Sequence, residues 1–267
     1  MTRCPPGTAS RSGPWSAALV ASVDVGHATL PVYLTRFFGR DAEGARLRAE
    51  VLGHRLVTLL GPGGSGKTRL AVELAAALRE AGSAAAGGSG AGQTPPFDFV
   101  AFVPLVNCAT RTLVLDALIA SLHLRQHGDD AFEPLIAALH GRRALLVLDN
   151  FEQLSGRAED VVARHAELIP GLHLLVTSRR VLGLDGEREF AIQPLALPSL
   201  GLALGEAAIN PAVALFVDRA RAVRADFHIG PSNLAALVEL VHPLEGMPLA
   251  IEPAAAPATC AMRRCCS

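Results

Sequence analysis

Residues 61–68 carry the clearest chemical signal in the chain. They read Gly-Pro-Gly-Gly-Ser-Gly-Lys-Thr and match G-x-x-x-x-G-K-[ST], a pattern whose inward-facing backbone N–H groups surround a phosphate. Lys67 is the only lysine in the sequence, and its compact ammonium group on a flexible stem can reach phosphate oxygens. The Thr68 hydroxyl suits Mg²⁺. The pattern therefore predicts a site for a nucleoside triphosphate and Mg²⁺.

The sequence on both sides of this loop agrees with a phosphate site. Residues 55–60 form a short apolar run typical of a buried strand, and residues 69–78 have the composition and spacing of a helix. The helix would add its positive N-terminal end to the site. We expect Lys67 to face solvent while the site is empty. The residues assigned to phosphate binding are Gly61, Pro62, Gly63, Gly64, Ser65, Gly66, Lys67, Thr68 and Arg69.

A second candidate site residue, Asp149, ends the apolar run 144–149. A buried parallel strand delivers its last side chain to the carboxyl edge of the sheet, where a carboxylate can hold Mg²⁺ beside the loop. Asn150 stands where many hydrolytic proteins of this kind carry a second acid, and Glu152 is the next carboxylate. Either hydrolysis is slow or Glu152 acts as the base, and the sequence leaves both readings open.

Strands and helices alternate through most of the chain. We expect strands at 55–60, 97–103, 144–149, 172–177 and 189–192, with helices at 41–52, 69–78, 112–122 and 131–139. This order predicts an α/β P-loop NTPase fold, with a mostly parallel sheet covered by helices on both faces. From residue 210 the pattern becomes helical only. Asn210 and Pro211 favour a helix start before 212–223, and Ser232 can cap 233–241.

These patterns divide the chain into four parts. We expect a flexible leader at 1–29, a nucleotide-binding domain at 30–200 with a mobile insertion at 81–95, a partial helical subdomain at 201–253, and an irregular tail at 254–267. The insertion is predicted from low-complexity Gly, Ser and Ala. The tail is predicted because Pro253 stands where a helix would otherwise continue.

Composition excludes several classes of protein. The net charge is −1 and the sequence has no basic block, which argues against direct nucleic-acid binding by this chain. Apolar runs are too short to span a membrane, and the apolar stretch at 17–20 is too short for a signal peptide. The five cysteines lack zinc-ligand spacing and are odd in number. Free thiols in a reducing cytoplasm are therefore expected.

Five segments together resemble one family. Residues 146–154, Leu-Val-Leu-Asp-Asn-Phe-Glu-Gln-Leu, resemble the metal-binding strand of bacterial signal-transduction ATPases with numerous domains. More narrowly, they resemble the NB-ARC-like modules of large LuxR-type and antibiotic-regulatory transcriptional activators. Residues 30–40, 174–179, 214–220 and 246–252 resemble four further motifs of that family in the same order.

The resemblance implies roles for residues outside the loop. Phe38, Gly39 and Arg40 are expected to border the adenine, and Pro248 to pack against the base. Arg179 is expected to reach the γ-phosphate. The family implies an ATP/ADP-dependent switch with Mg²⁺ in a cytoplasmic regulator, contacting protein partners or itself through the ATPase module. With Lys67, Asp149 and Glu152, Arg179 completes the candidate catalytic set.

The end of the chain departs from this family. The winged-helix subdomain, sensor repeats and DNA-binding domain that the resemblance implies do not follow residue 252, so we expect a truncation or a shifted reading frame. Two other functions stay open at this point. One is a non-catalytic nucleotide-binding or protein-interaction scaffold, which Asn150 favours. The other is a small-molecule phosphotransferase, against which the 177–179 and 246–248 segments argue.

Overall fold

The computed structural model describes most of the chain but not all of it. The predicted leader, except for residue 29, lies outside the described residues, as does the centre of the predicted insertion. The described residues are 29–86, 95–124, 132–154, 159–199, 201 and 203–264.

The predicted parallel sheet is confirmed. Its strands follow the order β2-β3-β4-β1-β5, and every pairing between neighbours is parallel. β3 and β4 are buried along their whole length, which explains why the sequence shows them as uninterrupted apolar runs. The strands are β1 Leu56–Leu60, β2 Phe99–Pro104, β3 Ala144–Asp149, β4 Leu172–Ser178 and β5 Glu187–Ala191.

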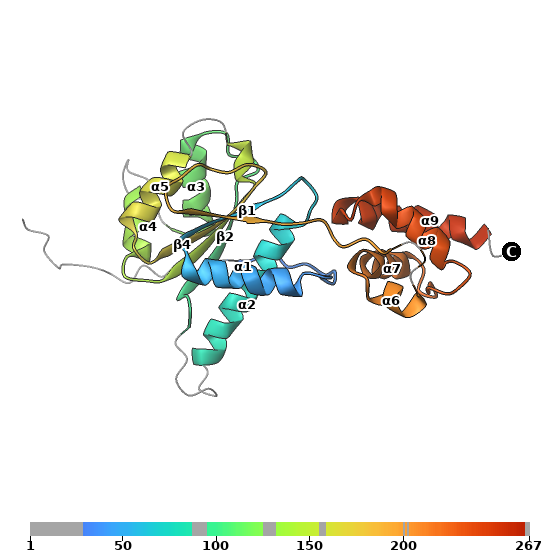
Figure 1. Ribbon diagram of the computed structural model, residues 1–267. Helices are drawn as coiled ribbons and strands as arrows, with labels where there is room; N and C mark the ends of the chain where they lie inside the picture. The colour runs from blue at the N-terminus through green and yellow to red at the C-terminus, as the bar shows by residue number, and fades with distance from the viewer. Residues whose placement is uncertain are drawn as a thin grey trace, which may run out of the picture.

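Helices cover both faces of this sheet, as expected from the alternating pattern. Figure 1 shows α1 and α2 on one face and α3, α4 and α5 on the other. Each face has its own apolar core, one built around α1 and α2 and the other around α3 to α5. The helices are α1 Asp41–Gly53, α2 Lys67–Ala86, α3 Arg111–Ser121, α4 Phe132–Leu139 and α5 Glu159–Leu168.

Strand register brings the candidate site residues to one edge of the sheet. Leu60, the last residue of β1, pairs with Ser178 at the end of β4. Asp149, the last residue of β3, pairs with Pro104 at the end of β2. The segments that leave β1, β3 and β4 therefore start side by side. This shared edge holds the phosphate-binding loop, Asn150 and Arg179.

The first part of the predicted mobile insertion is helical instead. α2 continues to Ala86, so residues 81–86 are helical and extend from the body of the domain (Figure 1). Alanine is the strongest helix former, and residues 84–86 are all alanine. Gly82 lies within this helix, which tolerates a glycine at a cost of about 1 kcal/mol.

The chain from residue 203 forms a separate helical subdomain, which lies beyond the sheet in Figure 1. The predicted cap is confirmed, since the Asn210 side chain accepts hydrogen bonds from the N–H groups of Ala212 and Val213 at 3.1 and 3.2 Å. The expected cap at Ser232 is wrong, because Asn233 precedes the next helix. The helices are α6 Leu204–Ile209, α7 Pro211–Val223, α8 Leu234–Val241 and α9 Pro248–Arg264.

The expectation of an irregular tail from residue 254 is also wrong. α9 runs from Pro248 to Arg264 and contains Pro253 and Pro257. Each proline removes one backbone hydrogen bond. The helix persists because it packs along α7 with Ile251 and Ala255 fully buried, and because alanine favours helix at the positions between the prolines. Tertiary packing outweighs local propensity here.

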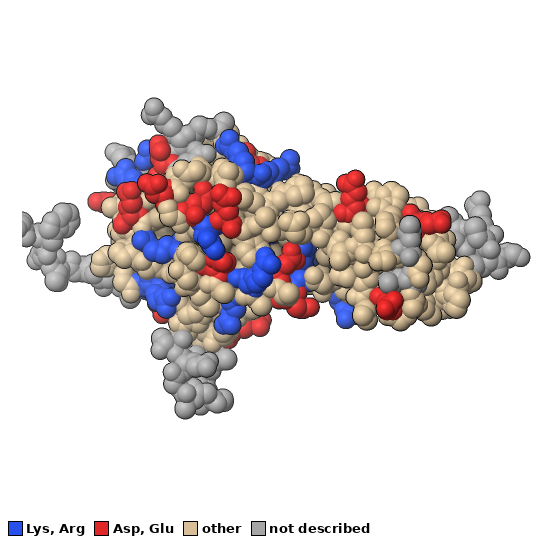
Figure 2. Space-filling view, in the orientation of Figure 1, with Lys and Arg blue, Asp and Glu red and all other residues tan. Residues whose placement is uncertain are grey.

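Helix length and surface charge bear on membrane insertion and nucleic-acid binding, the two classes of function that composition argued against. None of the helices in the described part of the chain is long and apolar enough to cross a membrane. On the face shown in Figure 2, acidic and basic side chains are interspersed over the sheet domain, and the helical subdomain shows mainly uncharged surface. This face therefore lacks the extended basic patch that binds a nucleic-acid backbone.

Candidate nucleotide-binding site

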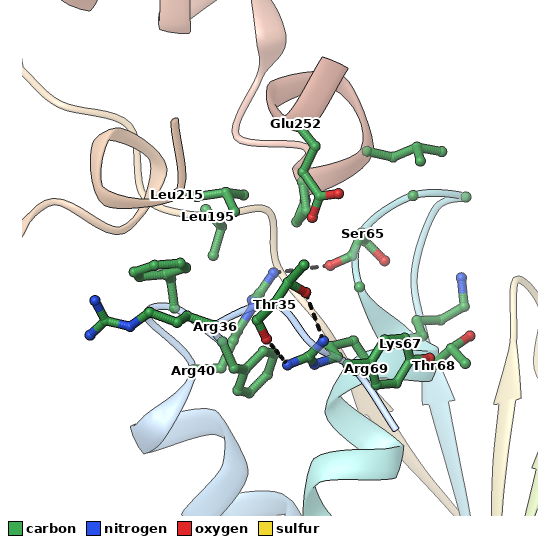
Figure 3. A pocket seen from close by; sticks show the side chains of 18 of the residues that line it. Thr35, Arg36, Arg40, Ser65, Lys67, Thr68, Arg69, Leu195, Leu215 and Glu252 are labelled. Atoms are coloured by element: carbon green, nitrogen blue, oxygen red, sulfur yellow. Dashed lines mark hydrogen bonds between the residues drawn. The ribbon is translucent and has the colours of Figure 1, made fainter. Parts of the chain in front are cut away.

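A cavity of about 350 Å³ lies between the phosphate-binding loop, the segment before α1 and the first turn of α9. Figure 3 shows side chains from all three elements pointing into it. Of the residues that line it, 12 were assigned to the site from the sequence and 9 were not. The lining residues are Tyr33, Thr35, Arg36, Phe37, Phe38, Arg40, Gly63, Gly64, Ser65, Gly66, Lys67, Thr68, Arg69, Asn150, Glu152, Arg179, Leu195, Leu215, Pro248, Leu249 and Glu252.

The loop backbone has the conformation that its glycines permit. Gly64 and Gly66 have φ angles of +80° and +92°, in the left-handed region that favours glycine. Gly61 is packed so closely that an added Cβ would lie 2.5 Å from Cγ2 of Ile192. The Ser65 hydroxyl donates to the Pro62 carbonyl at 2.9 Å and closes the loop on itself.

Lys67 is not solvent-facing, contrary to the expectation from the sequence. Its side chain is buried, with 7% exposed, and its Nζ donates to the carbonyl oxygens of Gly61 and Pro62 at 2.9 and 3.0 Å. Burial lowers the pKa of the Lys67 ammonium group. The loop carbonyls therefore hold the Lys67 ammonium group at the base of the cavity. A phosphate would have to approach this point to contact the ammonium group directly.

Asp149 lies at the centre of a hydroxyl network at the sheet edge. Its Oδ1 accepts hydrogen bonds from Thr68 Oγ1 at 2.7 Å and from Thr177 Oγ1 at 2.6 Å. Thr177 Oγ1 also accepts the Asn150 N–H at 3.0 Å. These bonds tie the loop helix to the ends of β3 and β4. Thr177 lies within the 174–179 segment, but its residue type gave no sign of this role.

The oxygen donors at this position fit Mg²⁺. Thr68 supplies a hydroxyl and Asp149 a carboxylate, and Mg²⁺ prefers oxygen ligands while retaining several waters. Within the described ranges, no group of three or more His, Cys, Asp or Glu side chains could hold a metal by itself. Such a sparse donor set agrees with a cation held mainly by phosphate oxygens and water.

The turn after β3 brings Glu152 to Arg179. Asn150 has a φ of +61°, a left-handed conformation that Asn tolerates better than most residues, and it precedes the short 3₁₀ helix Phe151–Gln153. Glu152 Oε1 lies 3.0 Å from Arg179 Nε. Two of the four residues assigned to catalysis from the sequence are therefore ion-paired with each other at the wall of the cavity.

Arg40 contacts the loop directly. It is 4% exposed, its Nη2 donates to the Ser65 carbonyl at 3.1 Å, and its Nη1 pairs with Glu43. Arg40 thus pairs with a neighbouring acid and also lines the cavity. Its contact with adenine stays a prediction.

Aromatic rings and arginines from the segment before α1 form one side of the cavity. Arg69 lies over the Tyr33 ring at 4.2 Å, pairs with Glu73 at 2.7 Å and donates to Thr35. Burial raises the pKa of the Tyr33 phenol, and the Asp149 carboxylate adds to this effect. The guanidinium of Arg69 therefore interacts with the side chains of three neighbouring residues. Tyr33 was missed, although it lies within the quoted 30–40 motif.

The first turn of α9 closes the opposite side of the cavity. The Leu249 N–H donates to the Gly64 carbonyl at 3.3 Å. A Cβ on Gly64 would lie 2.8 Å from Cβ of Leu249, and one on Gly66 would lie 3.8 Å from Cγ of Pro248. Glu252 projects into the cavity from the same helix (Figure 3). Pro248 was predicted to be here, whereas Leu249 and Glu252 were not assigned.

Two glycines allow the helical subdomain to approach the sheet domain. Gly39 has a φ of +64°, and a Cβ there would lie 2.2 Å from Cβ of Pro211 at the start of α7. Gly246 has a φ of +67°, and its added Cβ would lie 2.1 Å from the Leu195 carbonyl oxygen. Gly39 does not line the cavity, so in this structure its contact is with α7.

The fold and site together define a P-loop NTPase of the α/β class. The sequence model of the family described as Novel STAND NTPase 1 matches residues 33–241. The chain belongs to this family, which supports the predicted signal-transduction ATPase resemblance and implies nucleotide binding. The match covers the sheet domain and most of the helical subdomain.

The chain is similar in sequence to several bacterial proteins. An uncharacterized protein of Mycobacterium tuberculosis is 34% identical over 236 residues, covering 88% of this chain and 53% of the relative. A protein of the same organism named "Putative HTH-type transcriptional regulator" is 35% identical over 213 residues, covering 79% of this chain and 21% of the relative. The chain thus spans about half of the first relative and a fifth of the second.

Solved structures show the same fold at low sequence identity. Cdc6p from Pyrobaculum aerophilum superposes with a TM-score of 0.57 and 17% identity, covering 88% of this chain and 65% of that one. A Walker-type ATPase of Pyrococcus abyssi gives a TM-score of 0.52 and 14% identity, covering 90% and 75%. These likenesses concern the fold alone.

Proposed function

We propose that this chain is the ATP/ADP-binding switch module of a cytoplasmic transcriptional or signalling regulator, similar to the NB-ARC-like modules of LuxR-type regulators. One observation supports it most. The cavity is bounded by the phosphate-binding loop on one side and by the first turn of α9 on the other. A nucleotide in this cavity would contact both subdomains, so its phosphate state can alter how they pack.

Different residues of the cavity would bind the phosphates, the Mg²⁺ ion and the base of the nucleotide. The loop N–H groups and Lys67 would hold the phosphates, and Thr68 and Asp149 would hold Mg²⁺, which neutralises charge on the β- and γ-phosphates when bound. Phe38, Arg40 and Pro248 would border the base. Leu195 and Leu215 add apolar surface to this end of the cavity.

Hydrolysis by such a module would be slow. Asn150 cannot accept a proton as a carboxylate does, and Glu152 can do so only after its ion pair with Arg179, 3.0 Å long, has opened. We expect turnover comparable to that of unassisted switch GTPases, roughly 10⁻⁴ to 10⁻³ s⁻¹, instead of the ~10 s⁻¹ of a typical enzyme. Protein partners, or a second copy of the chain, would read the nucleotide state through the ATPase module.

Hydrogen exchange in the first turn of α9 tests the switch. Amide exchange of peptides covering residues 246–252 is followed by mass spectrometry with no nucleotide, with Mg-ADP and with Mg-ATP. The Leu249 N–H that bonds Gly64 makes this segment the sensitive one. Peptides from the buried strand β3 serve as the internal control, and the Lys67→Met variant serves as the non-binding blank.

The switch predicts different protection of residues 246–252 with ADP and with ATP, and no change in the blank. Equal protection with both nucleotides, once binding of each is demonstrated, would contradict the switch. That result would favour a nucleotide-binding scaffold, the reading that Asn150 also favours.

A further inference from the structure

The turn after β3 directs Glu152 toward the cavity. Asn150 is held by its N–H bond to Thr177 Oγ1 at 3.0 Å. The next residue, Phe151, is 1% exposed, and its ring is buried in the core and anchors the turn there. The next side chain, Glu152, lines the cavity and is 12% exposed. Its position is therefore fixed by backbone and packing on both sides.

The two oxygens of the Glu152 carboxylate have different surroundings. Oε1 is paired with Arg179 at 3.0 Å. Oε2 is shielded from solvent and accepts no hydrogen bond from any described residue. An unsatisfied buried acceptor costs free energy, and more so when it carries charge. Such an atom beside a ligand cavity is suited to a partner that arrives with the ligand, such as a water molecule.

Arg179 is the partner of this pair that is free to move. Its side chain is 63% exposed, and the guanidinium lies over Gly63, where an added Cβ would be 3.3 Å from Nη2. The charges of Glu152 and Arg179 both act on Lys67, so all three groups share one electrostatic environment. Arginine binds phosphate through strong charge-assisted hydrogen bonds. A γ-phosphate held by this loop would therefore compete with Glu152 for Arg179.

We propose that Glu152 is the general base for hydrolysis and that Arg179 holds it inactive until a γ-phosphate draws the guanidinium away. This inference rests on the proposed function. Arg179 and Glu152 would thus form an exchangeable lock. ADP lacks the competing phosphate, so the ion pair re-forms after hydrolysis.

The chemical step is a single displacement. The oxygen of a water molecule forms a bond to the γ-phosphorus as the bond from that phosphorus to the β,γ-bridging oxygen breaks. The electron pair leaves with ADP, and the proton of the water passes to Oε2 of Glu152. Glu152 then returns the proton to solvent, and phosphate and ADP are released.

Three variants of the full chain separate the two residues: Glu152→Gln, Arg179→Gln and the double variant. Glu50→Gln is the matched control, because Glu50 pairs with Arg188 at 2.9 Å on the exposed surface near the opposite edge of the sheet. Binding of fluorescent ATP and ADP analogues is measured first. Phosphate release from γ-labelled ATP is then followed under single-turnover conditions, with circular dichroism as the check on folding.

Glu152→Gln should slow phosphate release by about 10²-fold or more, the range lost with a general base. It should also raise the preference for ATP over ADP, because Arg179 no longer has a competing carboxylate. Arg179→Gln should lower both that preference and the release rate. Adding Glu152→Gln to Arg179→Gln should leave the preference unchanged, and Glu50→Gln should leave both quantities unchanged.

Unchanged phosphate release in Glu152→Gln would overturn the base assignment, and so would a wild-type protein that binds ATP without releasing phosphate. An unchanged ATP preference in that variant would overturn the lock. Failure of the wild type to bind either analogue is a separate result, seen in the binding measurement, and it would remove the proposed function as well.

Discussion

Asp149 holds a hydrogen-bond network together and is also the proposed ligand of Mg²⁺. Its Oδ1 accepts from Thr68 and Thr177. Asparagine can keep both hydrogen bonds through its carbonyl oxygen but loses the charge. Asp149→Asn should therefore fold normally and lose at least about tenfold of the Mg²⁺-dependent gain in ATP affinity, equivalent to ~1.4 kcal/mol.

Titrations of a fluorescent ATP analogue with Mg²⁺ and with EDTA measure this effect. Asp185→Asn is the control, because Asp185 is exposed in the loop before β5. Equal weakening with and without the metal would mean that Asp149 only supports the network of hydroxyl groups.

Arg40 is predicted to stabilise the fold as well as the site. Truncation to alanine would leave the Ser65 carbonyl without its side-chain donor and Glu43 without its cation. We expect Arg40→Ala to lower the free energy of unfolding by about 1–3 kcal/mol, the cost of an unsatisfied buried group. Urea denaturation measures it, and Arg188→Ala, which breaks an exposed pair, should cost under about 1 kcal/mol. Equal losses would show that burial of Arg40 contributes nothing.

The positions of the loop residues and of Asp149 at one edge of the sheet could be predicted from the sequence, because the types and spacing of these residues follow a known motif and strand pattern. The burial of Lys67 could not, since it depends on the carbonyls of Gly61 and Pro62 turning toward it. The Glu152–Arg179 pair was also beyond the sequence. Both residues were named, but their contact depends on the turn geometry at Asn150.

Among the elements, β4 is joined to the end of α1 through His173. Its Nδ1 lies 3.0 and 3.1 Å from the carbonyl oxygens of Val51 and His54, so this nitrogen carries a proton and donates. Burial lowers the pKa of His173. The folded state therefore favours the neutral ring, and the unfolded chain takes up the proton more readily at acid pH. Stability is full above the unfolded pKa of about 6.5 and falls as the pH drops below it.

Urea unfolding at pH 7.5 and pH 5.5 checks this prediction. The wild type should lose more stability between these pH values than His173→Gln, because the variant has no ring to titrate. An equal pH dependence in both proteins would contradict the assignment.

The first turn of α9 makes an element-scale prediction of its own. Leu249 is 68% exposed, yet it lies against Gly64 of the phosphate loop. Leu249→Ala should leave the free energy of unfolding within about 0.5 kcal/mol and should speed ADP release by about fivefold, equivalent to ~1 kcal/mol. Stopped-flow release of a fluorescent ADP measures the rate. Leu113→Ala, on the far face of the sheet, is the control, and an unchanged release rate in Leu249→Ala would separate α9 from nucleotide retention.

The strands were predictable because a sheet buried on both faces requires continuous apolar runs, as in β3 and β4. The length of α9 could not be predicted, because the packing of Ile251 and Ala255 decides whether a helix continues through two prolines. Leu195 gave no signal at all. Its place in the cavity wall follows from the bond of its N–H to the Gly246 carbonyl, 51 residues away in sequence.

At the scale of the whole molecule, two subdomains share one cavity. The sheet domain supplies the phosphate loop, and the helical subdomain supplies the apolar wall and the first turn of α9. Gly39 approaches Pro211 of α7 closely where these parts meet, and the Leu195 N–H bond to the Gly246 carbonyl fixes the chain that links them. The proposed switch and the proposed Glu152–Arg179 lock both require a nucleotide to bind at this junction.

The most direct test is the affinity of the purified chain for Mg-ATP, compared with that of Lys67→Met. Methionine keeps the length of the buried side chain and removes the ammonium group that bonds Gly61 and Pro62. Isothermal titration calorimetry gives both affinities, and urea denaturation confirms that both proteins are folded. We expect saturable binding by the wild type and a loss of affinity of at least about a hundredfold in the variant, equivalent to ~2.8 kcal/mol. Equal affinities in two folded proteins would contradict it.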